Sequence, residues 1–267
     1  MFTIVLGILT AVAIFSAVDL TTEMSKGWSI FFGVLGYVVV QLTVSLILRQ
    51  KMKGIQNNLQ AVMQGTQKNI ERKQQMFIHQ RNMNLTMQRM QMEAEQKKGL
   101  EAALAVCDQY KPLFRWSPFV KKQVITMKVS FLFQQKNWEE VDRLLPDCLF
   151  LDPFTVCMGL VRKYKTKAAD LDKFYKKRTR ILRKDSCVLP AATYSWILLK
   201  LGRKEDAMKA LNEALKKTDN AILARNRDAI ANDKLKQFSN ADLAETWYAL
   251  GLEEPKMPKI QQRVAYR

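Results

Sequence analysis

The sequence has almost no charge over its first 48 residues, which hold one Lys, no Arg and two acidic residues. Residues 2–18 and 28–48 contain no charged side chain at all. This absence argues against a channel or a proton path, because such paths need ionisable groups at membrane depth. The positive charge therefore lies in residues 49–267, which hold 42 basic and 23 acidic residues (42 − 23 = +19), so the two parts of the chain suit different solvents.

The sequence also has little that could support catalysis or metal binding. Its single His is His79, and its four cysteines form no CxxC pair. It has no HExxH motif, no Walker loop, no nucleophile elbow and no Gly-rich phosphate loop. We therefore expect no metal, no cofactor and no enzymatic activity. The cysteines are expected to be reduced and buried, as in cytoplasmic domains: Cys107, Cys148, Cys157 and Cys187.

Each uncharged stretch is long enough, or nearly so, to cross a hydrocarbon core of about 30 Å as a helix. We therefore predict a transmembrane hairpin over residues 1–48. A cleaved signal peptide is the alternative for residues 2–18, but no Lys or Arg precedes them and the apolar run is long. The loop between the spans is slightly acidic, whereas the segment after Leu48 is strongly basic. The positive-inside rule then predicts both termini and the soluble part in the cytoplasm, at a bacterial plasma membrane.

Small residues within the spans are candidates for close helix contact, because they let helix backbones approach each other. The single amide in these spans needs a hydrogen-bond partner across a helix interface. We expect these residues to pack the two spans together rather than to form a specific oligomer motif. The set is Gly7, Ala11, Gly33, Gly36 and Gln41.

Residues 49–98 contain no Pro and are rich in Gln, Met and Lys, which favours helix. We predict a stalk: one long helix that continues from the second span and ends near Gly99. Apolar residues recur at heptad spacing, with a gap in the middle, as in a weak coiled coil. The stripe could be covered either by another copy of the chain, in self-association, or by the chain's own domain, against which the stalk would lie as a spacer. Its members are Ile55, Leu59, Val62, Met76, Met83, Met87, Met90 and Ala94.

Beyond residue 99 the pattern changes to short amphipathic helices separated by Pro, Gly and Asp. We predict helices near 101–110, 119–134, 137–149, 154–164, 168–183, 189–201, 204–217, 220–236 and 240–250. The last is expected to begin at a Ser239–Asp242 capping pair and to bury Trp247. An extended tail is predicted over 253–267, with Glu253 and Glu254 facing solvent.

Two of these segments share a residue spacing. The first contains Val141, Leu145, Cys148 and Pro153, and the second contains Gly202, Ala207, Leu211 and Ala214. This pattern resembles the tetratricopeptide repeat (TPR), which places small, large and small residues in its second helix, a Gly before that helix and a Pro that closes it. A repeat of about 34 residues predicts a further copy between the two segments, but the intervening sequence does not match. The resemblance implies an α-solenoid over residues 99–252 with a concave protein-binding face.

Basic residues are densest between residues 162 and 184. A solvated helix face, anionic lipid and an acidic protein partner are the competing explanations, and nucleic acid is disfavoured because no nucleic-acid motif accompanies the charge. The residues are Arg162, Lys163, Lys165, Lys167, Lys173, Lys176, Lys177, Arg178, Arg180, Arg183 and Lys184.

The sequence thus predicts an all-α protein that consists of a two-helix transmembrane hairpin, a long stalk helix and a TPR-like α-solenoid. We expect a self-associating, membrane-anchored scaffold that presents a binding domain to a protein partner. The alternatives are an accessory subunit of a larger membrane complex and a lipid-surface-binding protein that shapes membranes.

Overall fold

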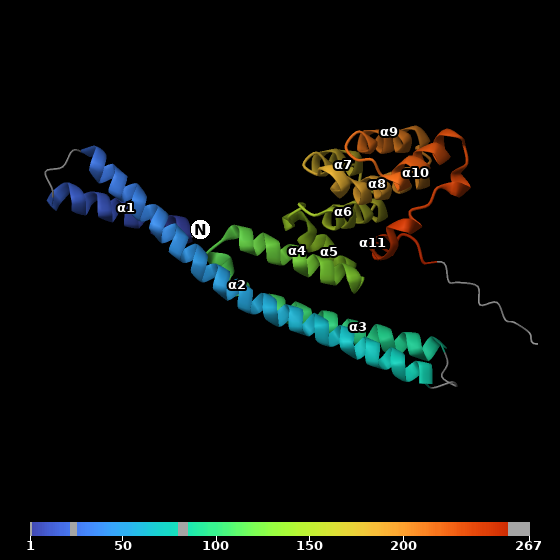
Figure 1. Cartoon of the computed structure of the whole chain (residues 1–267), viewed down its shortest axis with the longest axis horizontal. Helices are drawn as coiled ribbons and strands as arrows, with labels where there is room; N and C mark the ends of the chain where they lie inside the picture. The colour runs from blue at the N-terminus through green and yellow to red at the C-terminus, as the bar shows by residue number, and fades with distance from the viewer. Residues whose placement is uncertain (1, 22–25, 80–84, 256–267) are drawn as a thin grey trace, which may run out of the picture. The chain divides into compact units, whose positions relative to one another are not determined.

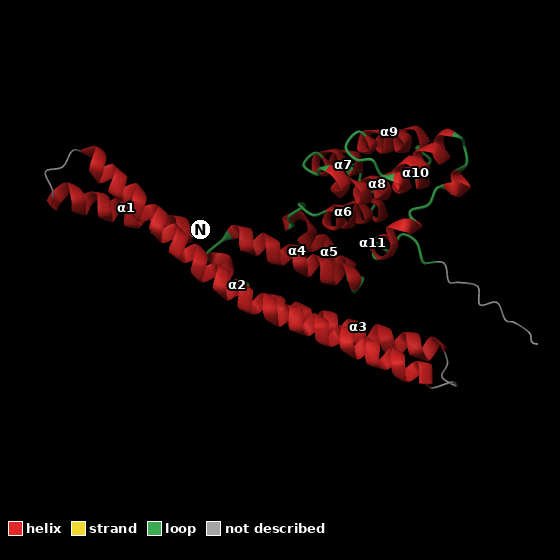
Figure 2. Cartoon of the chain, viewed as in Figure 1, coloured by secondary structure: helices red, strands yellow, loops and turns green. Residues whose placement is uncertain are grey.

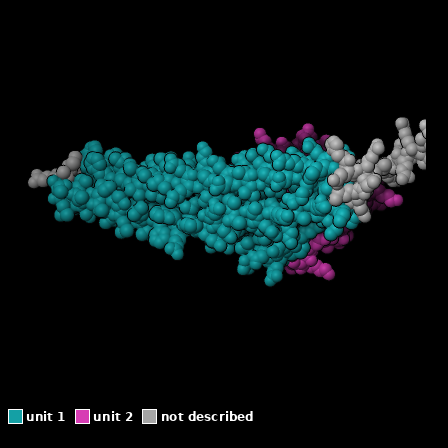
Figure 3. Space-filling model, turned by 90° about the horizontal axis from the view of Figure 1, so that it is seen from below, with its two compact units in different colours: residues 1–148 teal, residues 149–267 magenta. Residues whose placement is uncertain are grey.

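The structure is a computed structural model that describes residues 2–21, 26–79 and 85–255. It is all-helical, and no strand occurs in these ranges (Figures 1 and 2). The expected all-α class is therefore confirmed. The chain divides into two compact units, Met1–Cys148 and Leu149–Arg267 (Figure 3). The predicted boundary between stalk and soluble domain, at residues 98 and 99, falls inside the first unit. Met83 of the heptad stripe and most of the expected tail lie outside the described residues.

The first unit begins with two helices, α1 (Phe2–Thr21) and α2 (Lys26–His79), that pack against each other. Both are long and apolar enough to cross a membrane. The helix α2 has 54 residues, which gives it a length of roughly 80 Å at 1.5 Å per residue. It continues without a break through Leu48, where the apolar run ends, into the polar sequence that follows.

The predicted single helix from the second span to Gly99 is wrong. The helix α2 ends at His79, and α3 (Leu85–Asp108) lies alongside it (Figure 1). The two helices are antiparallel, because Lys73 Nζ lies 2.7 Å from Glu95 Oε1 whereas Leu59 shares a buried cluster with Ala103 and Val106. The apolar stripe of the stalk is thus partly buried against its own chain, which a single straight helix could not do.

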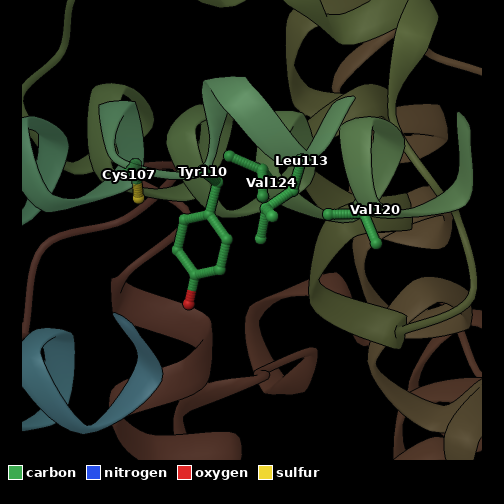
Figure 4. Close-up of a cluster of buried hydrophobic side chains, with 5 residues drawn as sticks. All are labelled: Cys107, Tyr110, Leu113, Val120 and Val124. Carbon is green, nitrogen blue, oxygen red and sulfur yellow. The ribbon is translucent and has the colours of Figure 1, made fainter. Parts of the chain in front are cut away.

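A second cluster lies where α3 returns along α2. It joins the end of α3, the 3-10 helix η1 (Lys111–Arg115) and α4 (Pro118–Gln134). Leu48, Met52 and Ile55 of α2 pack against this cluster. The unit continues with α5 (Trp138–Leu144) and the 3-10 helix η2 (Leu145–Asp147). The buried side chains of the cluster, shown in Figure 4, are Cys107, Tyr110, Leu113, Val120 and Val124.

The second unit consists of α6 (Pro153–Lys165), α7 (Leu171–Thr179), α8 (Val188–Lys200), α9 (Lys204–Leu215), α10 (Ala221–Ala231) and α11 (Ala244–Tyr248). The helix α8 packs against α6, α7, α9 and α10, so it forms the centre of this unit. Its sequence is nearly all apolar, which explains why Ile197 and Leu198 are fully buried. The side chains of Asp152 and Asn220 cap α6 and α10 by accepting backbone N–H bonds.

The C-terminal helix differs from the prediction. Only Ala244–Tyr248 is α-helical, after a 3-10 turn (Ala241–Leu243). Ala244 has φ +50°, a left-handed conformation that interrupts a continuous helix. Asp242 pairs with Arg225 instead of completing a capping box, and Trp247 is fully buried as expected.

Candidate functional site

The contact between α1 and α2 is lined by the small residues that the sequence singled out. A Cβ added to Gly7 would lie 2.7 Å from the Tyr37 ring, and one added to Gly33 would lie 3.1 Å from the Ala11 carbonyl oxygen. Gly36 faces Ile14. Such close approach leaves no room for larger side chains at these positions.

Gln41 crosses the same contact. Its Nε2 donates a hydrogen bond of 2.8 Å to the main-chain oxygen of Thr3 in the first turn of α1. The amide therefore has a partner, and this bond ties the start of α1 to the last third of the apolar run of α2. An interhelical hydrogen bond of this kind helps to hold two helices together.

The outward faces of α1 and α2 are covered by large apolar side chains. Leu9, Val12 and Leu42 are among many that remain exposed, and Leu46 is 60% exposed. The remaining faces of the pair are therefore apolar surface with no protein cover in the described chain. An exposed apolar surface that extends along two helices is typical of contact with lipid or with another protein.

The repeat-like residues fall into different units. Val141, Leu145 and Cys148 are buried in the first unit, and Ala207, Leu211 and Ala214 are buried in the second unit. Gly202 has φ +74° in the tight turn between α8 and α9, where glycine is favoured. Pro153 does not close a helix as expected. It is the first residue of α6, a position that tolerates Pro because no intrahelical N–H bond is required there.

The basic stretch divides into packed and exposed residues. Arg162 is buried, and the Arg178 guanidinium lies 4.2 Å from the centre of the Phe150 ring. Lys163 pairs with Asp170 at 2.7 Å. These three positions serve the fold of the second unit. The others remain exposed: Lys165, Lys167, Lys173, Lys176, Lys177, Arg180, Arg183 and Lys184.

A cavity of about 490 Å³ opens where this basic stretch meets the α8–α9 turn. Lysine and apolar side chains both line it, a combination that suits an acidic segment with an apolar side chain. The volume lies in the range of ordinary ligand pockets. The lining residues are Lys163, Tyr164, Lys165, Lys167, Ala168, Leu171 and Leu201.

A charged network next to this cavity was not predicted from the sequence. The Asp172 carboxylate accepts bonds of 3.0 and 2.8 Å from the Arg203 guanidinium and one of 2.7 Å from the Tyr194 hydroxyl. These bonds hold the pKa of Asp172 below its usual value. The network joins α7, α8 and the α8–α9 turn. The one signal in the sequence was that Arg203 directly follows the Gly202 turn.

Glu253 was predicted to face solvent on the tail, and the residue is exposed, but its carboxylate also has partners in the second unit. Its two oxygens accept the indole N–H groups of Trp196 and Trp247 at 2.7 and 2.8 Å. The indole rings themselves lie edge to face. A buried indole N–H needs an acceptor, which explains why the chain after α11 returns to α8.

The thiols show no sign of activation. Burial raises the pKa of Cys107 and Cys148 to about 11, and it raises the pKa of Cys157 and Cys187 as well. A nucleophilic or metal-binding cysteine needs the opposite shift. In the described ranges, no group of three or more His, Cys, Asp or Glu could hold a metal ion. Comparisons with protein-family models, with curated proteins and with solved structures find no match.

Proposed function

We propose that this chain is a membrane-anchored helical scaffold that presents a TPR-like binding domain in the cytoplasm. In this proposal α1 and α2 form a transmembrane hairpin, and the rest of the chain stays on the inner side of a bacterial plasma membrane. The observation that carries it is the apolar outer face of the α1–α2 pair, which ends at Leu48 and is followed at once by Arg49, Lys51 and Lys53. Lipid would cover that face, and the basic residues would stay on the cytoplasmic side.

The second unit supports a binding role. Its helices pack in sequence around α8, and the Gly202 turn with Ala207, Leu211 and Ala214 keeps the spacing of the repeat family. The cavity lined by Lys163, Lys165 and Lys167 offers a site for an acidic partner protein. Charge complementarity at such a site guides the approach of a partner and selects against basic ones.

We also propose that the chain self-associates, through a shorter surface than the apolar stripe of residues 55–94 predicted. Leu59 and its neighbours are buried within the chain. The far end of the α2–α3 pair still exposes large apolar side chains, namely Met76, Ile78, Met87 and Met90. Methionine-rich surfaces adapt to several partners, which suits an assembly contact.

The test begins with full-length protein expressed in bacteria. It should sediment with membranes, resist extraction by salt and carbonate, and be released by detergent. Protease added outside intact cells should leave residues 149–267 intact. Release without detergent would contradict the membrane anchor, and digestion from outside would contradict the orientation.

Native mass measurement of the detergent-extracted complex then reports copy number and partners together. We expect a co-purifying protein to be lost in K165E/K167E and kept in K234E/K236E, which makes the same charge change at exposed lysines outside the cavity. Loss in both variants, or in neither, would argue against the cavity as the binding site. A fixed partner held at high salt in both variants would instead favour an accessory subunit.

A further inference from the structure

The chain returns to the end of the apolar run after leaving it. The helix α3 runs back along α2, and the Tyr110 hydroxyl at its end lies 3.5 Å from the main-chain oxygen of Met52. Met52 is only four residues beyond Leu48, so it lies about 6 Å further along α2 at 1.5 Å per residue. The segment that follows Tyr110 therefore begins beside the place where α2 changes from apolar to charged.

This segment also contacts the first turn of α1. The Thr3 hydroxyl donates a 3.2 Å hydrogen bond to the main-chain oxygen of Trp116, and the rings of Phe2 and Trp116 are 6.2 Å apart. If α1 spans the membrane, its first turn lies at one face of the bilayer. Trp116 must then lie at that same face, and this placement does not depend on the tilt of the helices.

The composition of the segment suits that position. Trp116 is 39% exposed and Phe119 is 57% exposed. Arg115, Lys121 and Lys122 beside them are also exposed. Aromatic rings between basic side chains are typical of the interface between headgroups and acyl chains, where the rings are half wet and the cations meet anionic lipid.

We propose that residues 115–122 form a third membrane contact, in addition to the two spans. Trp116 and Phe119 insert into the leaflet in which α1 begins, and Lys121 and Lys122 bind anionic headgroups. This inference rests on the proposed membrane anchor. Its consequence is that the base of the first unit is fixed to the bilayer at three points, so the α2–α3 pair cannot swing freely about the end of the second span.

The lipid is favoured over a protein as the occupant of this surface. The surface adjoins the apolar face of α1 and α2 through the Phe2–Trp116 contact. Its rings are flanked by several cations, with Asp108 as the neighbouring acid that pairs with Lys111 and Lys128. A net positive surface that adjoins a lipid-facing surface matches an anionic leaflet.

The test uses full-length protein in vesicles of phosphatidylcholine and phosphatidylglycerol. A polarity-sensitive fluorophore is attached to a cysteine introduced by F119C, with L46C as the positive control and M90C as the negative control. Met90 is 65% exposed on α3, far from the end of the apolar run. The native cysteines are buried, so the unmodified protein gives the labelling background.

We expect the label at position 119 to emit at shorter wavelength than at position 90. Nitroxide groups placed on shallow lipid carbons should quench it strongly, and quenching should decrease when phosphatidylglycerol is omitted. If position 46 is quenched but position 119 behaves like position 90, the third contact is refuted and the membrane anchor stands. If position 46 is not quenched either, both proposals fail. A blue-shifted label at 119 that lipid nitroxides do not quench would indicate a protein occupant and would also refute the inference.

Discussion

The return of α3 along α2 predicts that Gly99→Ala destabilises the first unit. Gly99 packs against Thr66 of α2, and an added Cβ would lie 2.8 Å from the Thr66 Cβ and closer still to its γ atoms. Overpacking of this kind costs typically about 1–3 kcal/mol. Replacing Gly by Ala in a helix returns roughly 0.5–1 kcal/mol, so the net loss should be about 1 kcal/mol.

Matched controls lie on the same helix pair. No atom lies within 4 Å of a Cβ added to Gly54 or Gly65. The same substitution there should therefore stabilise the protein by roughly 0.5–1 kcal/mol. If Gly→Ala lowers the stability at position 99 but raises it at positions 54 and 65, the loss at position 99 comes from packing against α2 and not from helix propensity.

The assay is thermal unfolding in mild detergent, combined with amide hydrogen exchange to localise the change to residues 59–66 and 99–106. Thr66→Ala removes the γ atoms nearest to the added methyl group, so T66A/G99A should recover part of the lost stability. If Gly99→Ala were as stabilising as Gly54→Ala, α3 would not lie on α2.

Three further predictions follow from named contacts. Because Arg203 holds the pKa of Asp172 below its usual value, the stabilisation from this pair is present at neutral pH and is lost as the pH falls through the lowered folded pKa. D172N should melt with a shallower acid dependence, and an equal slope would contradict the network. Maleimide should label none of the four cysteines in the native protein and all four in denaturant, whereas fast native labelling of Cys107 would refute its burial. Gln41→Leu should weaken the α1–α2 pair by about 0.6 kcal/mol, the mean for such bonds in membranes. Unfolding in detergent measures this loss, and Leu42→Ala, at an outward-facing position, serves as the neutral control.

The helices themselves could be predicted from the sequence because their signals are local. The uncharged runs indicated α1 and the first part of α2, and Pro, Gly and Asp marked most ends of α4 to α10 within a few residues. The Gly202 turn and the buried Ala207 followed from the spacing of small residues. Each of these inferences needs only the residues within one helix and its flanks.

The course of the chain between helices could not be predicted in the same way. The heptad stripe indicated that Leu59 is covered, but periodicity does not identify the residues that cover it, which are Ala103 and Val106, 44 and 47 residues later. Sequence residues 80–84 contain neither Gly nor Pro, the strongest turn signals, and only Asn82 and Asn84 hinted at a break in the helix. The Glu253–Trp247 bond was missed for a related reason, since Glu253 lies in a Pro-containing C-terminal segment that the local sequence predicts to be extended and solvated.

The reversal at the end of α2 changes what the stalk can do. A single helix from Arg49 to Gly99 would carry the following domain roughly 75 Å from the membrane surface. With α3 antiparallel to α2, Tyr110 is instead beside Met52, so the chain re-enters the region of the charge onset before α4 begins. The length of the polar helices then separates the charge onset from their opposite end, where Met76, Ile78, Met87 and Met90 are exposed. The α2–α3 pair thus carries exposed apolar side chains at one end and the basic, aromatic residues 115–122 at the other, which is why we propose a protein contact at the first and lipid at the second.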